Sequence, residues 1–460
     1  MKIDRLAYQS ITDFEPIIQQ PYSVVLDSTD QGHYDTRYTY IGFDPYAVIT
    51  VSKGKVTETF RENNSSNQYD DIDDYFNRVI LKWINNQQKT DTEKLMGGLI
   101  GYMSYESISC FQDFQAINCP SFSQLPEMIW GVYDRLICID HHQKRCELIV
   151  REDISGISLS KAAFLNQLNV FYNQTKAVKY SRFQLTSSVQ YPDFLEYKEK
   201  VNSILGWIQE GHTYQVNLSQ RYQAQFTGDP LALYFKLQAH SPAPYGAYLN
   251  YPEVQICSTS PELLISKVGD RLITRPIKGT IKRQKTESAD QKNRDKLKQS
   301  CKDRAELTMI IDLVRNDLKR VCSSGTVKVG ELYRLETFSH LHHLVTDVTG
   351  QWDKKSSHWD IIKAVFPGGS ITGAPKIRSV ELINALELEP RYIYTGSIGY
   401  IGFDGNIKLN IAIRTLYAHN KEVYFHSGSG IIADSNPKNE WDELKVKVQG
   451  IYSALMNSPK

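Results

Sequence analysis

The chain has 460 residues and carries 53 basic and 52 acidic side chains, so that its formal net charge is only +1. A chain of this length is too long to fold around one small hydrophobic core, and we expect one large composite domain or two halves. The balanced charge offers no attraction for nucleic acid or an anionic membrane, and no apolar run approaches membrane-spanning length, so neither is expected as a partner. The seven cysteines are scattered without CxxC pairs and no apolar signal segment follows Met1, a pattern typical of reduced thiols in a cytoplasmic protein.

Short β-branched and apolar runs between turn signals predict strands at Ser23–Leu26, Tyr38–Ile41, Ala47–Val51 and Gly97–Tyr102. The polar stretch Glu62–Gln68 predicts a loop. Apolar residues at helical spacing over Phe164–Tyr172 predict a helix, and the aperiodic polar stretch Asn173–Gln190 that follows is a candidate boundary. We therefore divide the chain into a strand-rich part, residues 1–180, and a second part, residues 181–460.

The second part begins with a clear helix signal. Asp193 is an N-cap residue with Glu196 three positions later, as in a capping box, and the apolar period that follows ends at Gly211. The segment Lys282–Arg304 is rich in charges of both signs, which favours a solvated loop and helix over a nucleic-acid surface.

The hexapeptide Arg275–Thr280 (Arg-Pro-Ile-Lys-Gly-Thr) is the most informative local pattern. The apolar segment Leu272–Thr274 predicts a strand that Pro276 interrupts, and Gly279 permits a tight turn or a close approach. We expect Lys278 to be held rigidly at the strand end. Such a lysine can bind an anion or, where a dry pocket or a nearby cation removes its proton, act as a nucleophile.

Two predicted helices each present two carboxylates three residues apart. The first helix carries Asp303 and Glu306, and the second begins at Asn436-Pro437, an N-cap followed by proline, and carries Glu440 and Glu443. Oxygen ligands for a hard cation such as Mg²⁺ are assembled in this way. The alternative is two amphipathic helices whose acids are solvated.

Two glycine-rich segments could present backbone N–H groups to an anion. One is Phe366–Lys376, which is not a P-loop because Ala-Pro-Lys follows Gly373. The other is Ser427–Gly430, directly after a predicted strand.

Taken together, these patterns resemble the chorismate-utilising enzyme family. The likeness is dense from about residue 191 to 450 and weaker before it, and it rests on Gly211–Arg221, Arg275–Thr280, Asp303–Asp317, His343–Thr346, Phe366–Lys376, Tyr394–Tyr400, Ile413–Thr415 and Ser427–Glu443. The resemblance implies an α+β fold of two orthogonally packed antiparallel sheets flanked by helices.

Within the family, the residue before Gly279 separates members by product. Lys278 matches the members that aminate chorismate at C4 to give 4-amino-4-deoxychorismate, on the route to 4-aminobenzoate and folate, whereas the anthranilate-forming members have alanine there. Anthranilate formation is the main alternative, and a salicylate- or isochorismate-forming enzyme fits less well. A non-catalytic paralogue kept as a binding subunit is a further alternative, which the presence of Lys278, Glu306, Glu443 and Arg414 disfavours.

The resemblance implies a role for each motif. Lys278 would attack C2 of chorismate, Glu262 would protonate the leaving C4 hydroxyl, and His343 would lie near that hydroxyl. Mg²⁺ would be bound directly by Glu306 and Glu443 and through water by Asp303 and Glu440. Arg414 would bind the enolpyruvyl carboxylate, and the other substrate-binding residues would be Tyr394, Ser370, Lys376 and the backbone of Gly428, Ser429 and Gly430.

Two further expectations concern partners. No cysteine lies in a Gly-x-Cys-x-Gly turn, so ammonia is expected from a separate glutamine amidotransferase subunit or from free ammonium. Ser28, Pro244 and Tyr245 match positions of a tryptophan pocket in the family, and whether this chain binds anything there is left open.

Overall fold

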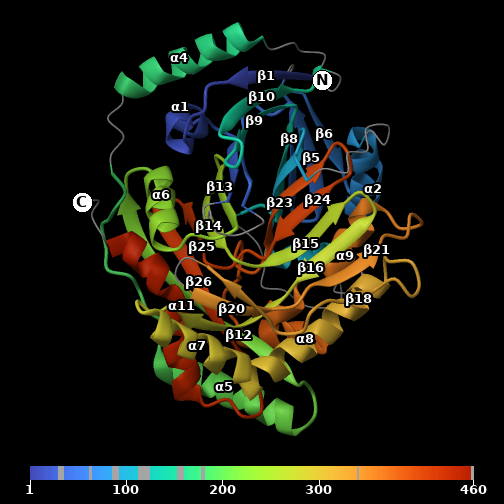
Figure 1. Cartoon of the computed structure of the whole chain (residues 1–460), viewed down its shortest axis with the longest axis vertical. Helices are drawn as coiled ribbons and strands as arrows, with labels where there is room; N and C mark the ends of the chain where they lie inside the picture. The colour runs from blue at the N-terminus through green and yellow to red at the C-terminus, as the bar shows by residue number, and fades with distance from the viewer. Residues whose placement is uncertain are drawn as a thin grey trace.

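The computed structural model describes residues 1–28, 36–61, 65–84, 93–111, 125–152, 160–177, 182–338 and 341–456. Two large antiparallel sheets and a small third sheet form the centre of this part of the chain, with helices outside (Figure 1). The α+β prediction of two antiparallel sheets flanked by helices is confirmed.

The first sheet has twelve strands in the described residues. Their order is β1 (Lys2–Leu6), β10 (Arg145–Val150), β9 (Arg135–Asp140), β3 (Tyr38–Gly42), β2 (Ser23–Asp27), β13 (Tyr245–Asn250), β14 (Gln255–Ser260), β25 (Thr415–His419), β26 (Glu422–Ile431), β12 (Gln215–Thr227) and β11 (Gln184–Leu185), with β22 (Gly373–Ala374) also paired to β12.

The second sheet has eleven strands in the same part of the chain, and the third has three. The second runs β18 (Lys328–Val329), β21 (Val348–Gln351), β16 (Arg271–Arg275), β15 (Leu263–Val268), β24 (Ile407–Asn410), β23 (Ser397–Gly402), β7 (Gly98–Met103), β8 (Met128–Tyr133), β4 (Ala47–Ser52), β5 (Lys55–Phe60) and β6 (Ser66–Tyr69). The third runs β17 (Ile277–Lys282), β20 (Leu341–Val345) and β19 (Arg334–Thr337). In both large sheets the strands from before residue 180 form one end and those from after it form the other, and the two groups meet where β2 pairs with β13 and where β7 pairs with β23.

A tyrosine-rich core contains residues from both large sheets, among them Val24 and Ala247 of the first and Ile100 and Ile398 of the second. The outer face of the first sheet packs against α1 (Glu15–Ile18), α4 (Lys161–Ala177), α6 (Pro230–His240) and α11 (Pro437–Met456). The second sheet packs against α2 (Ile72–Trp83), α8 (Cys301–Lys319) and α9 (His358–Val365). A separate cluster joins α5 (Phe194–Gln209), α10 (Lys376–Leu386) and α11 to β12 and β26.

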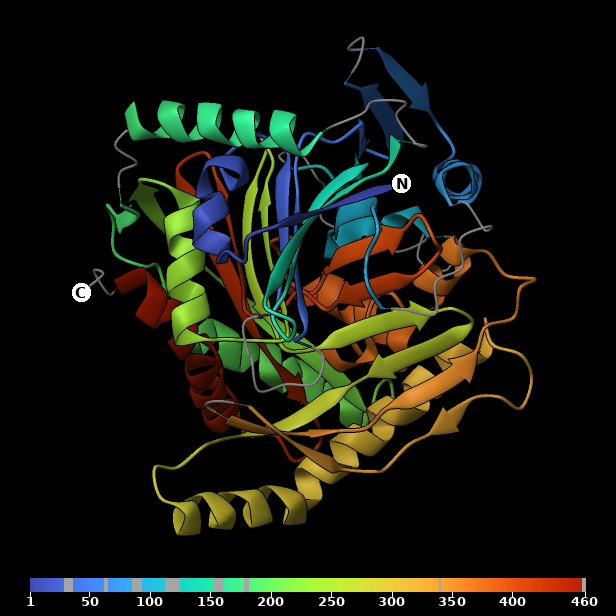
Figure 2. The ribbon, with the colours of Figure 1, turned by 45° about the horizontal axis from the view of Figure 1, so that its top comes forward.

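The figures show where these helices lie. In both views α4 runs across one end of the molecule, and α7 (Glu287–Gln299) and α8 lie at the opposite end (Figures 1 and 2). The 3₁₀ turn η5 (Gly369–Ile371) lies within the glycine-rich segment before α10.

Most local predictions are confirmed. The four N-terminal strands are β2, β3, β4 and β7, and the helix over Phe164–Tyr172 is part of α4, which continues to Ala177. The side chain of Asp193 caps α5 by accepting from the backbone N–H groups of Leu195 and Glu196, and Gly211 has the φ of +80° expected after a helix end.

One local prediction is partly wrong. Within the predicted loop Glu62–Gln68, residues 62–64 lie outside the described part, but Ser66–Tyr69 forms the edge strand β6, paired with β5. Its side chains are exposed, so no buried face imposes the alternation of apolar and polar residues that would have revealed it. The pairing is made by backbone groups alone.

The cysteines agree with the prediction of free thiols as far as the structure describes them. Six of them form no disulfide, and Cys119 lies outside the described residues. Within the described residues, no helix combines the length and apolar character needed to cross a bilayer.

Candidate active site

Lys278 lies at a strand end, as predicted, but at the start of a new strand in the small third sheet and not at the end of the strand before Pro276. Pro276 ends β16 because it has no N–H to donate, and the chain then begins the new strand β17, with Lys278 as its second residue. The lysine side chain is 13% exposed, and its Nζ lies 3.8 Å from Oε2 of Glu306 and 3.3 Å from the carbonyl oxygen of Ser370. The amine therefore points toward the acidic helices, away from bulk water.

Gly279 permits the close approach that the hexapeptide predicted. Its φ is +74°, and the pairing of β17 with β20 shifts register between Lys278 and Thr280. A Cβ at this position would lie 2.9 Å from Cγ of Asp303 and from Cδ1 of Leu297. Only glycine allows β17 to lie this close to α7 and α8, which brings Lys278 near the carboxylates of α8.

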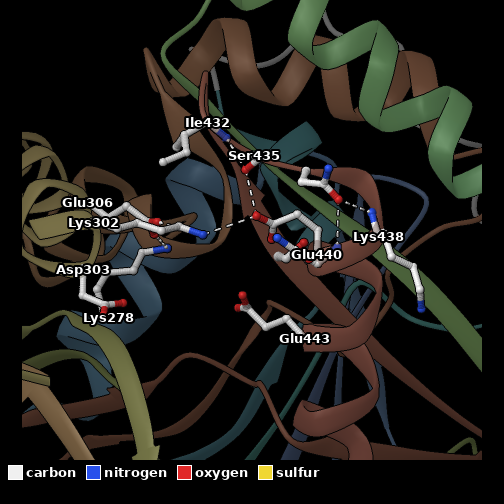
Figure 3. Close-up of polar contacts among 12 residues, drawn as sticks. Lys278, Lys302, Asp303, Glu306, Ile432, Ser435, Lys438, Glu440 and Glu443 are labelled. Atoms are coloured by element: carbon white, nitrogen blue, oxygen red, sulfur yellow. Dashed lines mark hydrogen bonds and ion pairs between the residues drawn. The ribbon is translucent and has the colours of Figure 1, made fainter. Parts of the chain in front are cut away.

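The two acidic helices face each other across a gap that contains a lysine (Figure 3). Ser300 caps α8 by accepting from the N–H of Asp303, and Asn436 caps α11 by accepting from Lys438 and Asn439. Nζ of Lys302 lies 3.3 Å from Oε1 of Glu440 on the other helix. No role for this lysine is predicted by its position in the sequence.

The charges around this gap set the protonation of its members. Burial raises the pKa of Glu306, and Lys278 and Lys302 oppose that shift in part. Burial opposes the charge of Glu443 as well, but its pKa is lowered overall by Lys447, whose Nζ lies 2.8 Å away. Burial also disfavours the charged form of Lys302, yet its pKa is raised by Glu440, Glu306 and Glu443.

These carboxylates fit a hard cation in their chemistry. All four predicted ligands offer oxygen atoms, which Mg²⁺ prefers, and the place between α8 and α11 already accommodates the positive amine of Lys302. Within the described residues, however, no three acidic, histidine or cysteine side chains converge closely enough to enclose an ion.

Glu262 lies beside Lys278, in the turn between β14 and β15. Its side chain is buried, and Oε1 accepts a hydrogen bond of 3.3 Å from the N–H of Ile277. Burial raises the pKa of Glu262, while the hydroxyl of Ser370 and the charge of Lys278 lower it in part. A carboxyl group that holds its proton more firmly than usual is suited to act as a general acid.

His343 is buried on β20, opposite Thr280 of β17. Its Nδ1 lies 2.8 Å from Oγ1 of Thr280, and its ring packs edge-on against Phe338. These contacts fix the ring next to the strand that carries Lys278. Its place near the C4 hydroxyl of a substrate stays a prediction.

Two glycines of β26 leave the backbone on one face of the strand uncovered by side chains. A Cβ at Gly428 would lie 2.7 Å from the hydroxyl of Tyr394, and a Cβ at Gly430 would lie 3.5 Å from Nζ of Lys278. Ser429 points to the other face, where its buried hydroxyl bonds that of Tyr197 at 3.0 Å. Only the backbone of Ser429 is therefore available to a ligand near Lys278.

Gln215 is a site residue that the sequence analysis missed. It is fully buried, and neither amide atom of its side chain has a hydrogen-bond partner among the described residues. A Cβ at Gly430 would lie 2.5 Å from its Nε2. Buried amides are nearly always paired, so this one indicates a polar ligand. The sequence feature that could have identified Gln215 is its position within Gly211–Arg221, one of the segments that carry the family resemblance.

Arg414 and Tyr394 form the predicted carboxylate-binding corner. Arg414 has φ of +51°, a conformation that side chains other than glycine rarely adopt, and its guanidinium has no partner among the described residues. Burial lowers its pKa to about 10. Tyr394 is stacked on His426 with ring centroids 5.1 Å apart, and burial raises its pKa.

The segment Phe366–Lys376 places its two predicted residues differently. Ser370 is buried in η5, between Glu262 and Lys278. Lys376 instead forms an ion pair of 2.7 Å with Asp317 and so ties the start of α10 to α8. The ammonium of Lys376 is therefore already paired in this structure, and its role in substrate binding stays a prediction.

The predicted tryptophan-pocket residues do line one pocket. Ser28, Pro244 and Tyr245 border a cavity on the first sheet that also reaches β23 and β24 of the second. Asp27 borders the same cavity, and burial raises its pKa. The pocket is thus lined by charged and apolar groups together.

A lysine beside a buried carboxylic acid, an arginine whose guanidinium has no partner among the described residues, and two helices with facing carboxylates form a site suited to a small carboxylate substrate. A family model described as chorismate binding enzyme matches residues 22–453, and the chain belongs to that family.

Relatives with different names are similar to nearly the whole chain. Aminodeoxychorismate synthase component 1 of Salmonella typhimurium is 34% identical over 445 residues, which cover 96% of this chain and 95% of the relative. Anthranilate synthase component 1 of Neisseria gonorrhoeae is 33% identical over a match that covers 95% of this chain and 90% of the relative. The crystal structure of anthranilate synthase component I from Streptococcus pneumoniae matches with a TM-score of 0.76 at 28% identity, covering 90% of this chain and 92% of that one.

Proposed function

We propose that this enzyme aminates chorismate at C4 to 4-amino-4-deoxychorismate, with Mg²⁺ as cofactor and ammonia from a glutamine amidotransferase subunit. The placement of Lys278 carries the proposal, because its amine lies beside the carboxylate of Glu306 and next to the buried acid Glu262. The name component 1 of the relatives supports a partner subunit. A cytoplasmic location stays a prediction.

Glu306 and Glu443 would hold Mg²⁺ directly, and Asp303 and Glu440 would hold it through water. When bound at the ring carboxylate of chorismate, the ion would neutralise negative charge and draw electron density from the ring. The fit rests on the oxygen chemistry of the four side chains and on the cation already held between the helices.

The chain's own groups would perform the substitution in two steps. Uncharged Lys278 forms a bond to C2, the ring double bond shifts, and the C4–O bond breaks as Glu262 gives its proton to the departing hydroxyl, which leaves as water. Ammonia then forms a bond to C4, the double bond shifts back, and the amine of Lys278 leaves C2. The new C4 ammonium returns a proton to Glu262. The sum is chorismate plus ammonia giving 4-amino-4-deoxychorismate plus water.

Substrate binding would rest first on Arg414, whose guanidinium has no partner among the described residues, and then on other polar groups of the site. The guanidinium of Arg414 can donate two parallel hydrogen bonds to the enolpyruvyl carboxylate, aided by Tyr394 and the backbone of β26. Ser370 would face the ring carboxylate, and His343 the C4 hydroxyl. In the separate pocket of Ser28, Pro244 and Tyr245 we propose a bound tryptophan, which equilibrium dialysis with that amino acid tests.

The decisive assay incubates the full chain with chorismate, Mg²⁺ and ammonium. A C4-aminated product supports the proposal, anthranilate supports the alternative carried by relatives at 33% identity, and unchanged chorismate supports a non-catalytic subunit. Addition of a glutamine amidotransferase subunit with glutamine should replace the need for ammonium.

Lys278→Ala should lower the rate of C4 amination by at least about a thousandfold, because no other amine of the site would deliver the first bond. The matched control is Lys282→Ala, which removes an exposed lysine from the same strand and should leave the rate unchanged. Intact mass spectrometry of the wild type with chorismate and Mg²⁺, without ammonia, should detect the covalent adduct. Normal turnover of Lys278→Ala would show that this lysine is not the nucleophile.

A further inference from the structure

Lys302 occupies the space between the two acidic helices. It extends from the first turn of α8 toward Glu440 of α11, and Glu443 points into the same gap (Figure 3). Its Nζ lies 3.3 Å from Oε1 of Glu440 and 3.9 Å from Oε1 of Glu306. One ammonium group thus lies within ion-pair distance of a carboxylate from each helix.

Glu440 depends on this amine for a countercharge, whereas Glu306 also has Lys278, whose Nζ lies 3.8 Å away. The Glu440 side chain is 3% exposed, and its other side-chain contact is the hydroxyl of Ser435, at 2.8 Å. In the described part of the chain, the Lys302–Glu440 pair is the one hydrogen bond or ion pair that joins α8 to α11. A buried carboxylate without a positive partner is costly, so some cation is required at this place.

Lys302 itself is free to leave. Its side chain is 49% exposed, and a lysine has a long flexible stem with a strongly hydrated head. A hydrated divalent ion needs the same oxygen atoms and several water molecules around it, and an ammonium at this distance would repel it. The amine and the metal ion therefore exclude each other.

We propose that Lys302 is a built-in competitor for the divalent cation: its ammonium holds α8 and α11 together while the metal is absent and has to swing into solvent when Mg²⁺ binds. The inference rests on the proposed metal site and goes beyond it, since it gives a role to a residue outside the ligand set. It follows that the lysine weakens Mg²⁺ binding and restricts it to concentrations at which the ion displaces the amine.

The test is direct Mg²⁺ binding to the full chain by isothermal titration calorimetry, without chorismate. Lys302→Met keeps the stem without the charge and should tighten Mg²⁺ binding by roughly threefold to fivefold, the upper end of the range that loss of a partly exposed ion pair corresponds to. Lys302→Arg keeps a positive charge and should bind Mg²⁺ no more tightly than the wild type. The rise in Tm on adding Mg²⁺ should likewise be larger for Lys302→Met.

Lys438→Met is the matched control. Lys438 lies on α11 close to Glu440, but it is 60% exposed and pairs with Asp442 at 2.8 Å, so its loss removes one nearby positive charge without opening the gap. Its Mg²⁺ affinity should stay within about twofold of the wild type.

The possible failures can be told apart. If Lys302→Met binds Mg²⁺ no more tightly than the wild type, or if neither binds it, the competition does not exist even where turnover of the wild type requires Mg²⁺. If Lys302→Met and Lys438→Met tighten binding equally, the effect is general charge and the inference also fails. If turnover of chorismate needs no divalent cation, the proposed function is what fails.

Discussion

Two arginines of this enzyme have opposite surroundings. The side chain of Arg391 is 1% exposed, and its guanidinium donates five hydrogen bonds, two of them to the carboxylate of Glu387 at 2.7 and 2.8 Å. Arg414 is partly exposed, its guanidinium has no partner among the described residues, and the residue sits on a left-handed backbone position. Burial lowers the pKa of Arg414 to about 10, whereas burial at Arg391 is outweighed by Glu387, which raises its pKa.

The same contrast separates the framework from the candidate active site as a whole. Around Arg391 the charged atoms meet at ideal distances, and the donors are used up within the fold. Around Lys278 and Lys302 the ion pairs are 3.3 to 3.9 Å long, and the side chain of Gln215 is unpaired. Polar groups with long or absent pairing can still bind a ligand. Polar groups that are fully paired within the fold contribute to stability only.

The largest effect is expected from removing the well-paired arginine. Arg391→Met leaves the buried carboxylate of Glu387 without its countercharge and should lower the free energy of unfolding by about 3–5 kcal/mol. Urea denaturation followed by circular dichroism measures it. The double variant Arg391→Met/Glu387→Gln should recover part of the loss, because no buried charge is then left alone. A single variant as stable as the wild type would mean that the pairing contributes nothing.

A pH dependence of stability should come from Glu106, whose Oε1 accepts from the N–H of Arg391 at 2.6 Å. Burial raises its pKa from 4.5 to about 7. Between these values the unfolded chain loses the proton while the folded protein keeps it, so the contribution of Glu106 to stability is largest below pH 4.5 and falls as the pH rises toward 7. The loss should be on the order of 3 kcal/mol.

Glu106→Gln keeps an oxygen for the backbone donors and cannot ionise. The difference in unfolding free energy between this variant and the wild type should therefore grow in favour of the variant across that pH range. Denaturant titrations at a series of pH values test this, and a constant difference would show that the carboxyl group ionises normally in the folded protein.

The smallest effect is expected from the open arginine, and it should appear in activity alone. Arg414→Lys keeps the charge but loses the planar fork, and it should cost roughly 2 kcal/mol, about thirtyfold in kcat/KM for chorismate. The free energy of unfolding should change by less than about 0.5 kcal/mol, because no partner is lost. If stability fell as much as activity did, Arg414 would belong with Arg391, and the contrast between the two would be wrong.

Local patterns in the sequence carried much of the site. Pro276 predicted the end of a strand and Gly279 predicted a close approach, and both are observed. The group that approaches Gly279 is a helix and not a ligand. The caps Asp193 and Asn436 placed two helices correctly, since capping depends on neighbours within one turn. The polar edge strand Ser66–Tyr69 was missed because its backbone pairing leaves no mark in its side chains.

The residue types at the site, the ends of its helices and its family membership were determined by the sequence itself, because each depends on short-range chemistry. Which charges meet was decided only by the tertiary structure. Lys376 is part of a matching motif yet pairs with Asp317, whereas Lys302 meets Glu440 across 138 residues of chain. An ion pair of this kind depends on how α8 and α11 are placed by their separate hydrophobic contacts, and no local pattern encodes that distance.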